Sequence, residues 1–303
     1  MTDHKMTPAE EKYLKQYDIK AYDRPSLTAD MAVFAILTSD QQEEYRKDPK
    51  KYLGILLIRR GSYPYKDDYG LPGGFAKKNE TIEETAHREL KEETSVDSAY
   101  LEPFGVFSRP GRDPRGWIIS QGFLALVDAG KYQVRAGTDA WEAAWFRIDM
   151  EQEELKKHVR SDRADITTLY SLNLEKDDIR LSALVKETRV FTGHHEKTEY
   201  TILEDKGFAF DHAEIIVRAL KALRERTAQS GRIVFDLMPE LFTLYSLQEV
   251  HEIILGEKLL TPNFRRKMAP FVLETSQIAG SGAGHRPAKL FKRNTEAFYS
   301  LPF

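Results

Sequence analysis

The sequence predicts an α+β protein with two domains. Its 303 residues exceed the usual size of one domain. Between residues 26 and 227, runs rich in apolar and β-branched residues mix with segments of helical periodicity. After residue 243, two short helical segments precede two short strand-like runs. We therefore expect a larger mixed α/β domain followed by a small domain of helices and a β-hairpin.

Composition narrows the possible classes of protein. The chain has no cysteine, which excludes disulfides, thiolate metal sites and a cysteine nucleophile. Its N-terminal stretch is charged and lacks the apolar core of a signal peptide. No run approaches the roughly 18 apolar residues of a membrane span. We expect a cytoplasmic protein with no membrane partner.

The first domain begins after a polar arm. Residues 1–25 are predicted to form this arm, with a short helix at 8–16. Apolar runs that predict strands follow at 26–38, 52–60, 102–108 and 118–127.

A short acidic helix carries the strongest chemical signal. Thr81 and Glu84 form a capping box, so a helix should begin near Ile82. On that helix Glu89, Glu92 and Glu93 stand at i, i+3 and i+4, on one face. The simplest alternative is a solvated acidic face. A divalent cation would relieve the repulsion among these carboxylates, with Mg²⁺ the usual choice beside phosphates and Mn²⁺ a possible substitute.

The spacing from Gly74 to Val96 resembles the Nudix box, with glutamate at 80, Arg-Glu-Leu at 88–90 and paired glutamates at 92–93. The one departure is Ser95, where that family has the glycine of a left-handed helix cap, at a modest cost for serine. The resemblance implies an α/β/α sandwich and hydrolysis of a nucleoside diphosphate derivative such as ADP-ribose. The implied catalytic set is Glu80, Arg88 and the three metal-binding glutamates, Glu89, Glu92 and Glu93, with Arg88 and Glu80 paired.

Two segments near the box are candidates for substrate binding. Gly73 and Gly74 form a turn that would let the backbone approach phosphate oxygens. A loop rich in proline and glycine offers three arginines and an aromatic ring, at Arg109, Arg112, Arg115 and Trp117. These side chains could hold a diphosphate and a stacked base or ribose, or the loop could be only a rigid surface hairpin. Its Arg-Asp-Pro-Arg-Gly run resembles a segment of ADP-ribose pyrophosphatases and related regulators of NAD metabolism, which favours the ligand role.

The rest of the first domain, 26–228, is less informative. Glu142 is our candidate for an auxiliary base and Asp139 the second choice, although a solvated turn carboxylate explains either. We expect residues 150–206 to form an irregular extension that contains one hairpin, with strands at 179–191 and 198–204. An amphipathic helix at 210–227 should close the domain before a linker at 228–232, and could contribute to a dimer interface.

The predicted second domain, 229–303, has the order of a winged helix-turn-helix. Ser246 is expected to cap a helix that ends at Gly256, and Thr261 with Pro262 to begin a second helix. Strands at 272–278 and 288–294 would form the wing. The second helix and the wing supply the candidate DNA-binding residues Arg265, Arg266, Lys267, His285, Arg286, Lys289 and Lys292.

Charge favours a polyanionic partner for this segment. Residues 243–293 hold eight lysines and arginines against four glutamates, a net +4, which leaves −7 on the remainder. The alternative is a small helical dimerisation domain. A Nudix domain followed by a winged helix resembles the Nudix-related transcriptional regulators of NAD metabolism. This resemblance implies a homodimer that binds ADP-ribose or a related metabolite and double-stranded DNA. The second hypothesis is an ADP-ribose-type pyrophosphatase whose C-terminal domain is not a DNA regulator.

Overall fold

The computed structural model describes residues 6–38, 50–96, 100–130, 140–279 and 288–300. The elements run along the chain as α1 (Pro8–Gln16), η1 (Ile19–Ala21), β1 (Ser26–Thr38), β2 (Lys51–Arg60), β3 (Tyr69–Gly70), β4 (Gly73–Phe75), α2 (Ile82–Thr94), β5 (Tyr100–Phe107), β6 (Ile118–Leu126), β7 (Ala140–Val159), β8 (Arg163–Lys176), β9 (Ile179–Thr192), β10 (His195–Lys206), α3 (His212–Gln229), η2 (Arg232–Leu237), α4 (Leu244–Leu255), α5 (Thr261–Met268), η3 (Ala269–Phe271), β11 (Val272–Ile278), β12 (Lys289–Arg293) and α6 (Thr295–Ser300). The predicted strands of the first domain and the two strands of the wing are all present.

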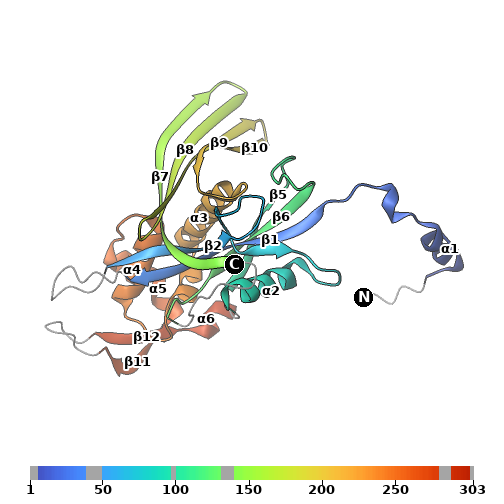
Figure 1. The fold of residues 1–303 in the computed structure, drawn as a ribbon. Helices are drawn as coiled ribbons and strands as arrows, with labels where there is room; N and C mark the ends of the chain where they lie inside the picture. Colours follow the sequence, from blue (N-terminus) through green and yellow to red (C-terminus); the bar gives the residue numbers. More distant parts are fainter. Residues whose placement is uncertain (1–5, 39–49, 97–99, 131–139, 280–287, 301–303) are drawn as a thin grey trace.

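One large sheet organises the first part of the chain. Its strand order is β10-β9-β8-β7-β2-β1-β6-β5, with β1 and β6 parallel and the other neighbours antiparallel. Helix α2 packs on one face of the central strands, and α3 packs on the other (Figure 1). Because both faces are covered, residues 28–35 of β1 are all buried, and its sequence is continuously apolar over 31–37. The α+β fold with an α/β/α sandwich is confirmed.

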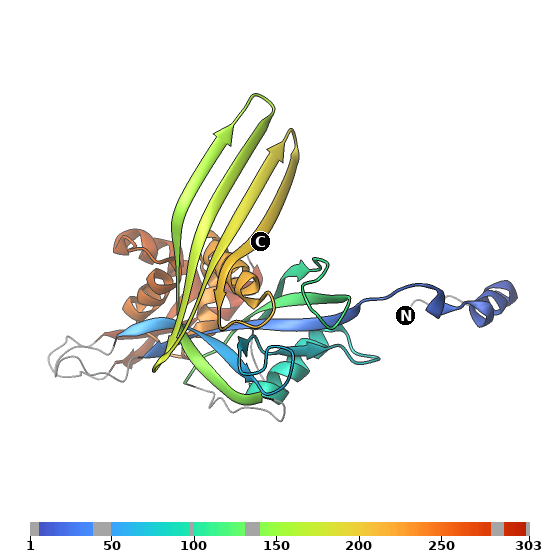
Figure 2. The ribbon, with the colours of Figure 1, turned by 45° about the horizontal axis from the view of Figure 1, so that its top comes forward.

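The prediction of an irregular extension at 150–206 was wrong. Strands β7 to β10 form long antiparallel ribbons that stand out from the body (Figure 2). Residues 151–159 of β7 are exposed on both faces. A strand without a buried face has no apolar alternation for the sequence to display. The predicted hairpin of β9 and β10 is confirmed.

Helix α3 joins the sheet to the C-terminal part. It runs two residues further than predicted, to Gln229, which leaves little linker before η2. Its predicted apolar stripe, including Ile216, Leu220 and Leu223, is buried within the chain. That stripe is therefore used within the chain, and a contribution of this helix to a dimer interface stays a prediction.

The C-terminal part has the predicted order of helix, turn, basic helix and hairpin. Two caps differ from the prediction. Thr243 caps α4 and accepts a hydrogen bond from the Ser246 N–H at 3.0 Å, so Ser246 lies inside the helix. The cap of α5 is Leu260, with Thr261 and Pro262 in the first turn. Buried residues of α4 and α5 belong to the same apolar cluster as α3 and the sheet, so the two parts pack as one body.

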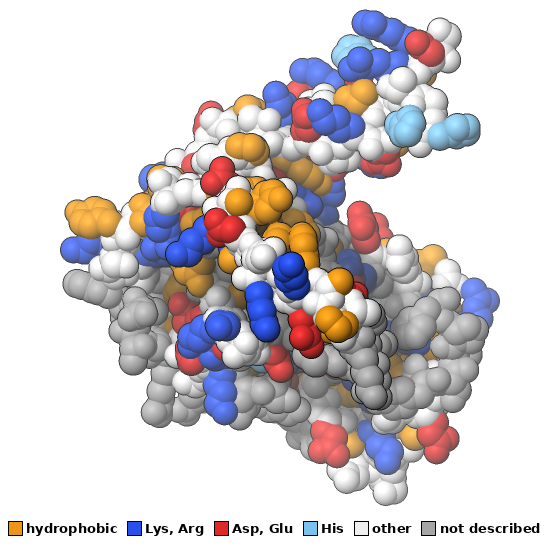
Figure 3. All heavy atoms as spheres, turned by 90° about the vertical axis from the view of Figure 1, so that its right-hand side faces the viewer, with side chains coloured by type: hydrophobic (Ala, Val, Ile, Leu, Met, Phe, Trp, Pro, Cys, Tyr) orange, Lys and Arg blue, Asp and Glu red, His pale blue; other side chains and the backbone are white. Residues whose placement is uncertain are grey.

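The N-terminal arm lies apart from this body (Figures 1 and 2). Helix α1 begins with a capping box of Thr7 and Glu10, and none of its residues is buried. Seen from the side of the arm, the surface shows cationic and anionic side chains intermixed (Figure 3). Among the residues described, no helix is long and apolar enough to cross a membrane.

Candidate functional site

The turn that precedes α2 lies directly against the box helix. The Gly73 N–H donates a hydrogen bond of 2.7 Å to the Glu93 carboxylate. At Gly74, a Cβ atom would come within 2.4 Å of the Glu89 carboxylate. A side chain at 74 would therefore displace the Glu89 carboxylate, and both predicted glycines lie at the acidic face.

The box helix is built as its sequence predicts. Thr81 and Glu84 form the capping box, and Ser95 takes the left-handed conformation, at φ 62°, in which a glycine would be free of strain. The predicted pairing of Arg88 and Glu80 is confirmed, with Nε 2.7 Å from the carboxylate. This hydrogen bond lowers the pKa of Glu80 to about 2.

Arg88 also offsets part of the repulsion among the glutamate carboxylates of this helix. Its guanidinium donates to Glu89 at 2.5 Å and to Glu92 at 3.2 Å. Glu92 is 55% exposed and also lies 3.9 Å from Lys77, so it faces solvent, unlike its two neighbours. The three glutamates predicted to share one metal are therefore divided into an inner pair and an outer carboxylate.

In the inner pair, Glu89 and Glu93, the pKa of Glu93 is strongly shifted. Burial, reinforced by the nearby carboxylates of Glu89 and Asp30, raises the pKa of Glu93 to about 8 against the opposing Gly73 hydrogen bond. Carboxylate oxygens that face one another are suitable donors for a hard divalent cation. Among the residues described, no three histidines, aspartates and glutamates are already arranged around a metal position. Glu89 would have to exchange its contact with Arg88 to join such a set.

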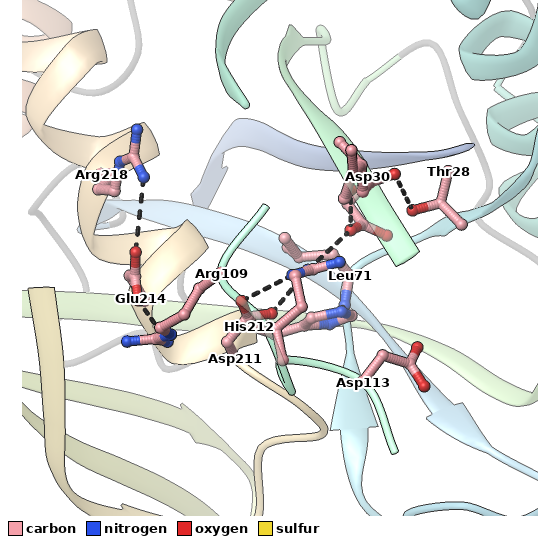
Figure 4. A network of polar contacts seen from close by, with 12 residues as sticks. Thr28, Asp30, Leu71, Arg109, Asp113, Asp211, His212, Glu214 and Arg218 are labelled. Atoms are coloured by element: carbon pink, nitrogen blue, oxygen red, sulfur yellow. Dashed lines mark hydrogen bonds and ion pairs between the residues drawn. The ribbon is translucent and has the colours of Figure 1, made fainter. Parts of the chain in front are cut away.

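The loop after β5 uses its arginines mainly for internal ion pairs (Figure 4). Arg112 is buried and makes two hydrogen bonds to Asp211, at 2.7 and 2.9 Å, with Asp30 at 3.7 Å. Arg109 pairs with Glu214 at 2.9 Å. These contacts attach the loop to the first turn of α3.

The other two predicted loop residues are exposed, as Arg109 is. Arg115 pairs with Asp113 at 2.7 Å and lies 5.1 Å from the ring centres of Phe75 and Phe210. Trp117 is 54% exposed, and its carbonyl accepts a hydrogen bond from the Ser26 N–H. Of the four loop residues, Arg112 and Arg115 line the cavity beside the box, with Arg115 presenting the more exposed cation.

That cavity has a volume of about 180 Å³ and brings together the glycine turn, the box helix and the loop. Several of its residues were missed from the sequence, among them Asp30, Arg60, Phe210 and His212. Arg60, at the end of β2, lies 4.8 Å from the centre of the Phe210 ring. Burial lowers the pKa of Arg60, and the positive charge of Arg115 lowers it further. Phe210 has a left-handed backbone, with φ 54°. Arg60 could have been suspected because a charged pair ends an apolar strand, but no local signal marks Phe210.

The auxiliary base candidates gain little from the structure. Glu142 pairs with Lys176 at 2.5 Å and is not among the residues that line this cavity. Asp139 lies outside the described residues.

The candidate DNA-binding residues divide into three groups. Arg265 and Arg266 are exposed on α5, whose Phe264 and Met268 face the core. Lys267 instead donates a hydrogen bond of 2.8 Å to the carbonyl of Ala228, at the end of α3. On the hairpin, Lys289 pairs with Glu274 and Lys292 is exposed, while His285 and Arg286 lie outside the described residues.

Comparisons with known proteins agree with this architecture. Residues 29–169 match the NUDIX domain, and residues 234–292 match the NrtR DNA-binding winged helix domain. The chain is 31% identical to the "ADPR responsive transcriptional repressor NtrR" of Acinetobacter baylyi, over 94% of this chain and 88% of the relative. The chain belongs to the NrtR family.

Other relatives cover one or both parts of this NrtR-family chain. The ADP-ribose pyrophosphatase of Methanocaldococcus jannaschii is 39% identical over 46% of this chain and 73% of its own length. Among solved structures, a MutT/nudix family protein of Enterococcus faecalis matches with a TM-score of 0.65 and 24% identity, over 95% of this chain and 94% of its own. Shewanella oneidensis NrtR complexed with a 27mer DNA matches with a TM-score of 0.58 and 24% identity, over 89% and 94% of the two chains. At these identities the two structures support the fold alone.

Proposed function

We propose that this protein is a ligand-responsive transcriptional repressor that binds ADP-ribose, or a related nucleoside diphosphate derivative, and double-stranded DNA. The observation that carries the proposal is one continuous body that holds both a cavity of arginines and carboxylates and an exposed basic helix. A repressor described as ADPR-responsive is similar to the chain over nearly its whole length. We assign the arm to 1–25, the ligand domain to 26–228 and the DNA-binding domain to 229–303.

The two functions use separate residue sets. For the ligand, the Gly73–Gly74 turn, Arg60 and Arg115 form the side of the cavity suited to phosphate, because guanidinium groups and backbone N–H groups recognise phosphate oxygens. Arg112 supports this side from within the protein, Arg109 ties the loop to α3 at Glu214, and Trp117 lies at the end of the loop. For DNA, Arg265 and Arg266 would meet base edges, while Lys289 and Lys292, with Arg286 and His285, would meet the backbone. The protein would act as a cytoplasmic homodimer on a palindrome.

The test is fluorescence anisotropy with labelled DNA from upstream of the protein's own gene, across a salt series, with and without ADP-ribose. Specific binding that weakens when ADP-ribose is added is the expected result. No binding at low salt, or equal binding to scrambled DNA, would exclude the regulator.

A second candidate function is Mg²⁺-dependent hydrolysis, favoured by the retained box. Glu89 and Glu93 would hold Mg²⁺ or Mn²⁺, with Glu92 at the outer edge. The metal would supply charge stabilisation at the diphosphate and an activated water. The Arg88–Glu80 pair holds the loop against α2, and Glu142 is retained only as a distant auxiliary base. The products from ADP-ribose would be AMP and ribose 5-phosphate. If Glu93→Gln and the wild type release AMP at the same rate, the hydrolase proposal is wrong.

A further inference from the structure

The first turn of α3 touches both parts of the proposed ligand site (Figure 4). Asp211, the residue before the helix, holds Arg112 of the loop through two hydrogen bonds. His212 Nδ1 accepts a hydrogen bond of 2.8 Å from the Leu71 N–H, just before the glycine turn. One short segment of chain therefore fixes the loop and the turn together.

The glycine turn is held from two sides. His212 binds it at Leu71, and Glu93 of α2 binds it at Gly73. The Gly73 N–H can donate to a phosphate oxygen of the ligand only if that oxygen displaces the Glu93 carboxylate. The turn then keeps its contact with α3 and loses the Glu93 contact with α2, so the turn and α3 would shift together relative to α2.

His212 is suited to a fixed contact. It is buried, and burial lowers its pKa, which keeps the ring neutral with Nδ1 free to accept. At Gly70 a Cβ atom would lie 2.9 Å from Nδ1, so the backbone approaches the ring closely. Asp30 lies on the far side of Arg112 and accepts a hydrogen bond from the Ser120 hydroxyl.

The other end of α3 contacts the winged helix. Arg224 donates a hydrogen bond of 3.0 Å to the carbonyl of Ile254 at the end of α4. The carbonyl of Ala228 accepts from Lys267 of α5. Between these two ends α3 has 18 residues, a rigid rod of about 27 Å.

We propose that Asp211 and His212 are positioning residues that couple the ligand site to the winged helix through α3. This inference rests on the proposed function, since it names the route by which ADP-ribose would change DNA affinity. A ligand can act only if it binds the two positions of α3 with different affinity. The exchange at Gly73 supplies that difference, because one position favours the Glu93 contact and the other favours the phosphate.

The experiment compares four variants, the fourth being Asp211→Asn, at saturating ADP-ribose, so that changes in ligand affinity do not enter. His212→Leu removes the acceptor, while His212→Asn keeps an acceptor near the place of Nδ1. Glu102→Gln is the matched control, because it removes the Arg226–Glu102 ion pair that ties α3 to β5 away from the ligand site. For each protein we measure the DNA dissociation constant with and without ADP-ribose, and amide exchange in α4 and α5.

In the wild type we expect ADP-ribose to weaken DNA binding by about 5- to 150-fold, the usual range of allosteric coupling. His212→Leu should reduce this ratio by about fivefold or more, with DNA affinity in the absence of ligand and thermal unfolding close to those of His212→Asn. His212→Asn and Glu102→Gln should keep the wild-type ratio and the ligand-dependent exchange. Asp211→Asn should reproduce the loss wherever it folds.

The possible failures are distinct. A wild type that binds ADP-ribose and DNA with no effect of one on the other overturns the proposed regulation, and the coupling with it. A wild type that responds, with His212→Leu responding equally, overturns the coupling alone and leaves the proposed function in place.

Discussion

Two sets of arginines, one in the loop after β5 and one on α5, differ in how they are satisfied. In the loop each of Arg109, Arg112 and Arg115 has a carboxylate partner, in Glu214, Asp211 and Asp113. On α5, Arg265 and Arg266 are exposed, and within the described ranges neither forms an ion pair. The two basic clusters thus have different roles. The loop arginines mostly stabilise the protein, and the α5 arginines are accessible to an external polyanion.

Arg112→Ala should produce the largest effect and reveal the structural nature of the loop pairs. Removing this guanidinium leaves Asp211 and Asp30 buried and without their cation. Breaking a buried pair in this way costs about 3–5 kcal/mol of the free energy of unfolding. Urea unfolding followed by circular dichroism measures the loss.

Arg115→Ala is its matched control. Arg115 is 40% exposed, and its buried partner Asp113 would keep the hydrogen bond from the backbone N–H of residue 115, so its loss should cost less than that of Arg112, about 1–3 kcal/mol. Instead it should weaken ADP-ribose binding in calorimetry. Equal stability of the two variants would show that the buried pair is not what distinguishes the loop.

The double substitution Arg265→Ala and Arg266→Ala tests the other set. Specific base contacts contribute about 1–3 kcal/mol each, so binding to a palindromic site should fall by about 100-fold or more. Stability should change little because both side chains are exposed. Lys258→Ala, at a 90% exposed lysine paired with Glu252 on the same domain, is the control and should bind normally. Specific binding that survives the double substitution would leave the hydrolase as the better function.

The contrast between the two sets of arginines also shows which features of the structure could be predicted from the sequence. The box helix, its caps and the Arg88–Glu80 pair follow from spacings of eight residues or fewer, and all were predictable. The partner of Arg112 lies 99 residues away, so no local pattern distinguishes a buried arginine from a ligand-binding one. For the same reason Phe210 was missed, and the exposed residues 151–159 of β7 showed no periodicity to predict.

A pH titration sharpens the comparison by asking whether burial, rather than the domain, decides the role of an ionisable group. His251 on α4 is the buried case in the winged helix, since burial lowers its pKa to about 4. In the unfolded chain His251 gains a proton below about pH 6.5, whereas in the folded chain it gains one only near pH 4. Stability is therefore full above pH 6.5 and is lost as the pH falls to 4, by about 3 kcal/mol.

His251→Gln, which does not titrate, should lose less stability than the wild type over this window. Urea unfolding at pH 7.5, 6, 5 and 4 measures the difference between the two proteins. Parallel pH profiles would mean that carboxylates alone account for the acid sensitivity.

The smallest expected effect concerns an exposed cation that has a partner. Lys289 on the wing pairs with Glu274, but its side chain is 65% exposed. An exposed pair contributes about 1 kcal/mol or less and is easily exchanged for a phosphate. Lys289→Ala should therefore weaken binding to specific and scrambled DNA alike, and reduce the slope of log affinity against log salt by about one. Lys12→Ala on the separate helix α1 is the control and should leave the slope unchanged. If Lys289→Ala leaves the slope unchanged too, Lys289 belongs with the loop arginines as a structural cation, and exposure alone does not identify the DNA-binding face.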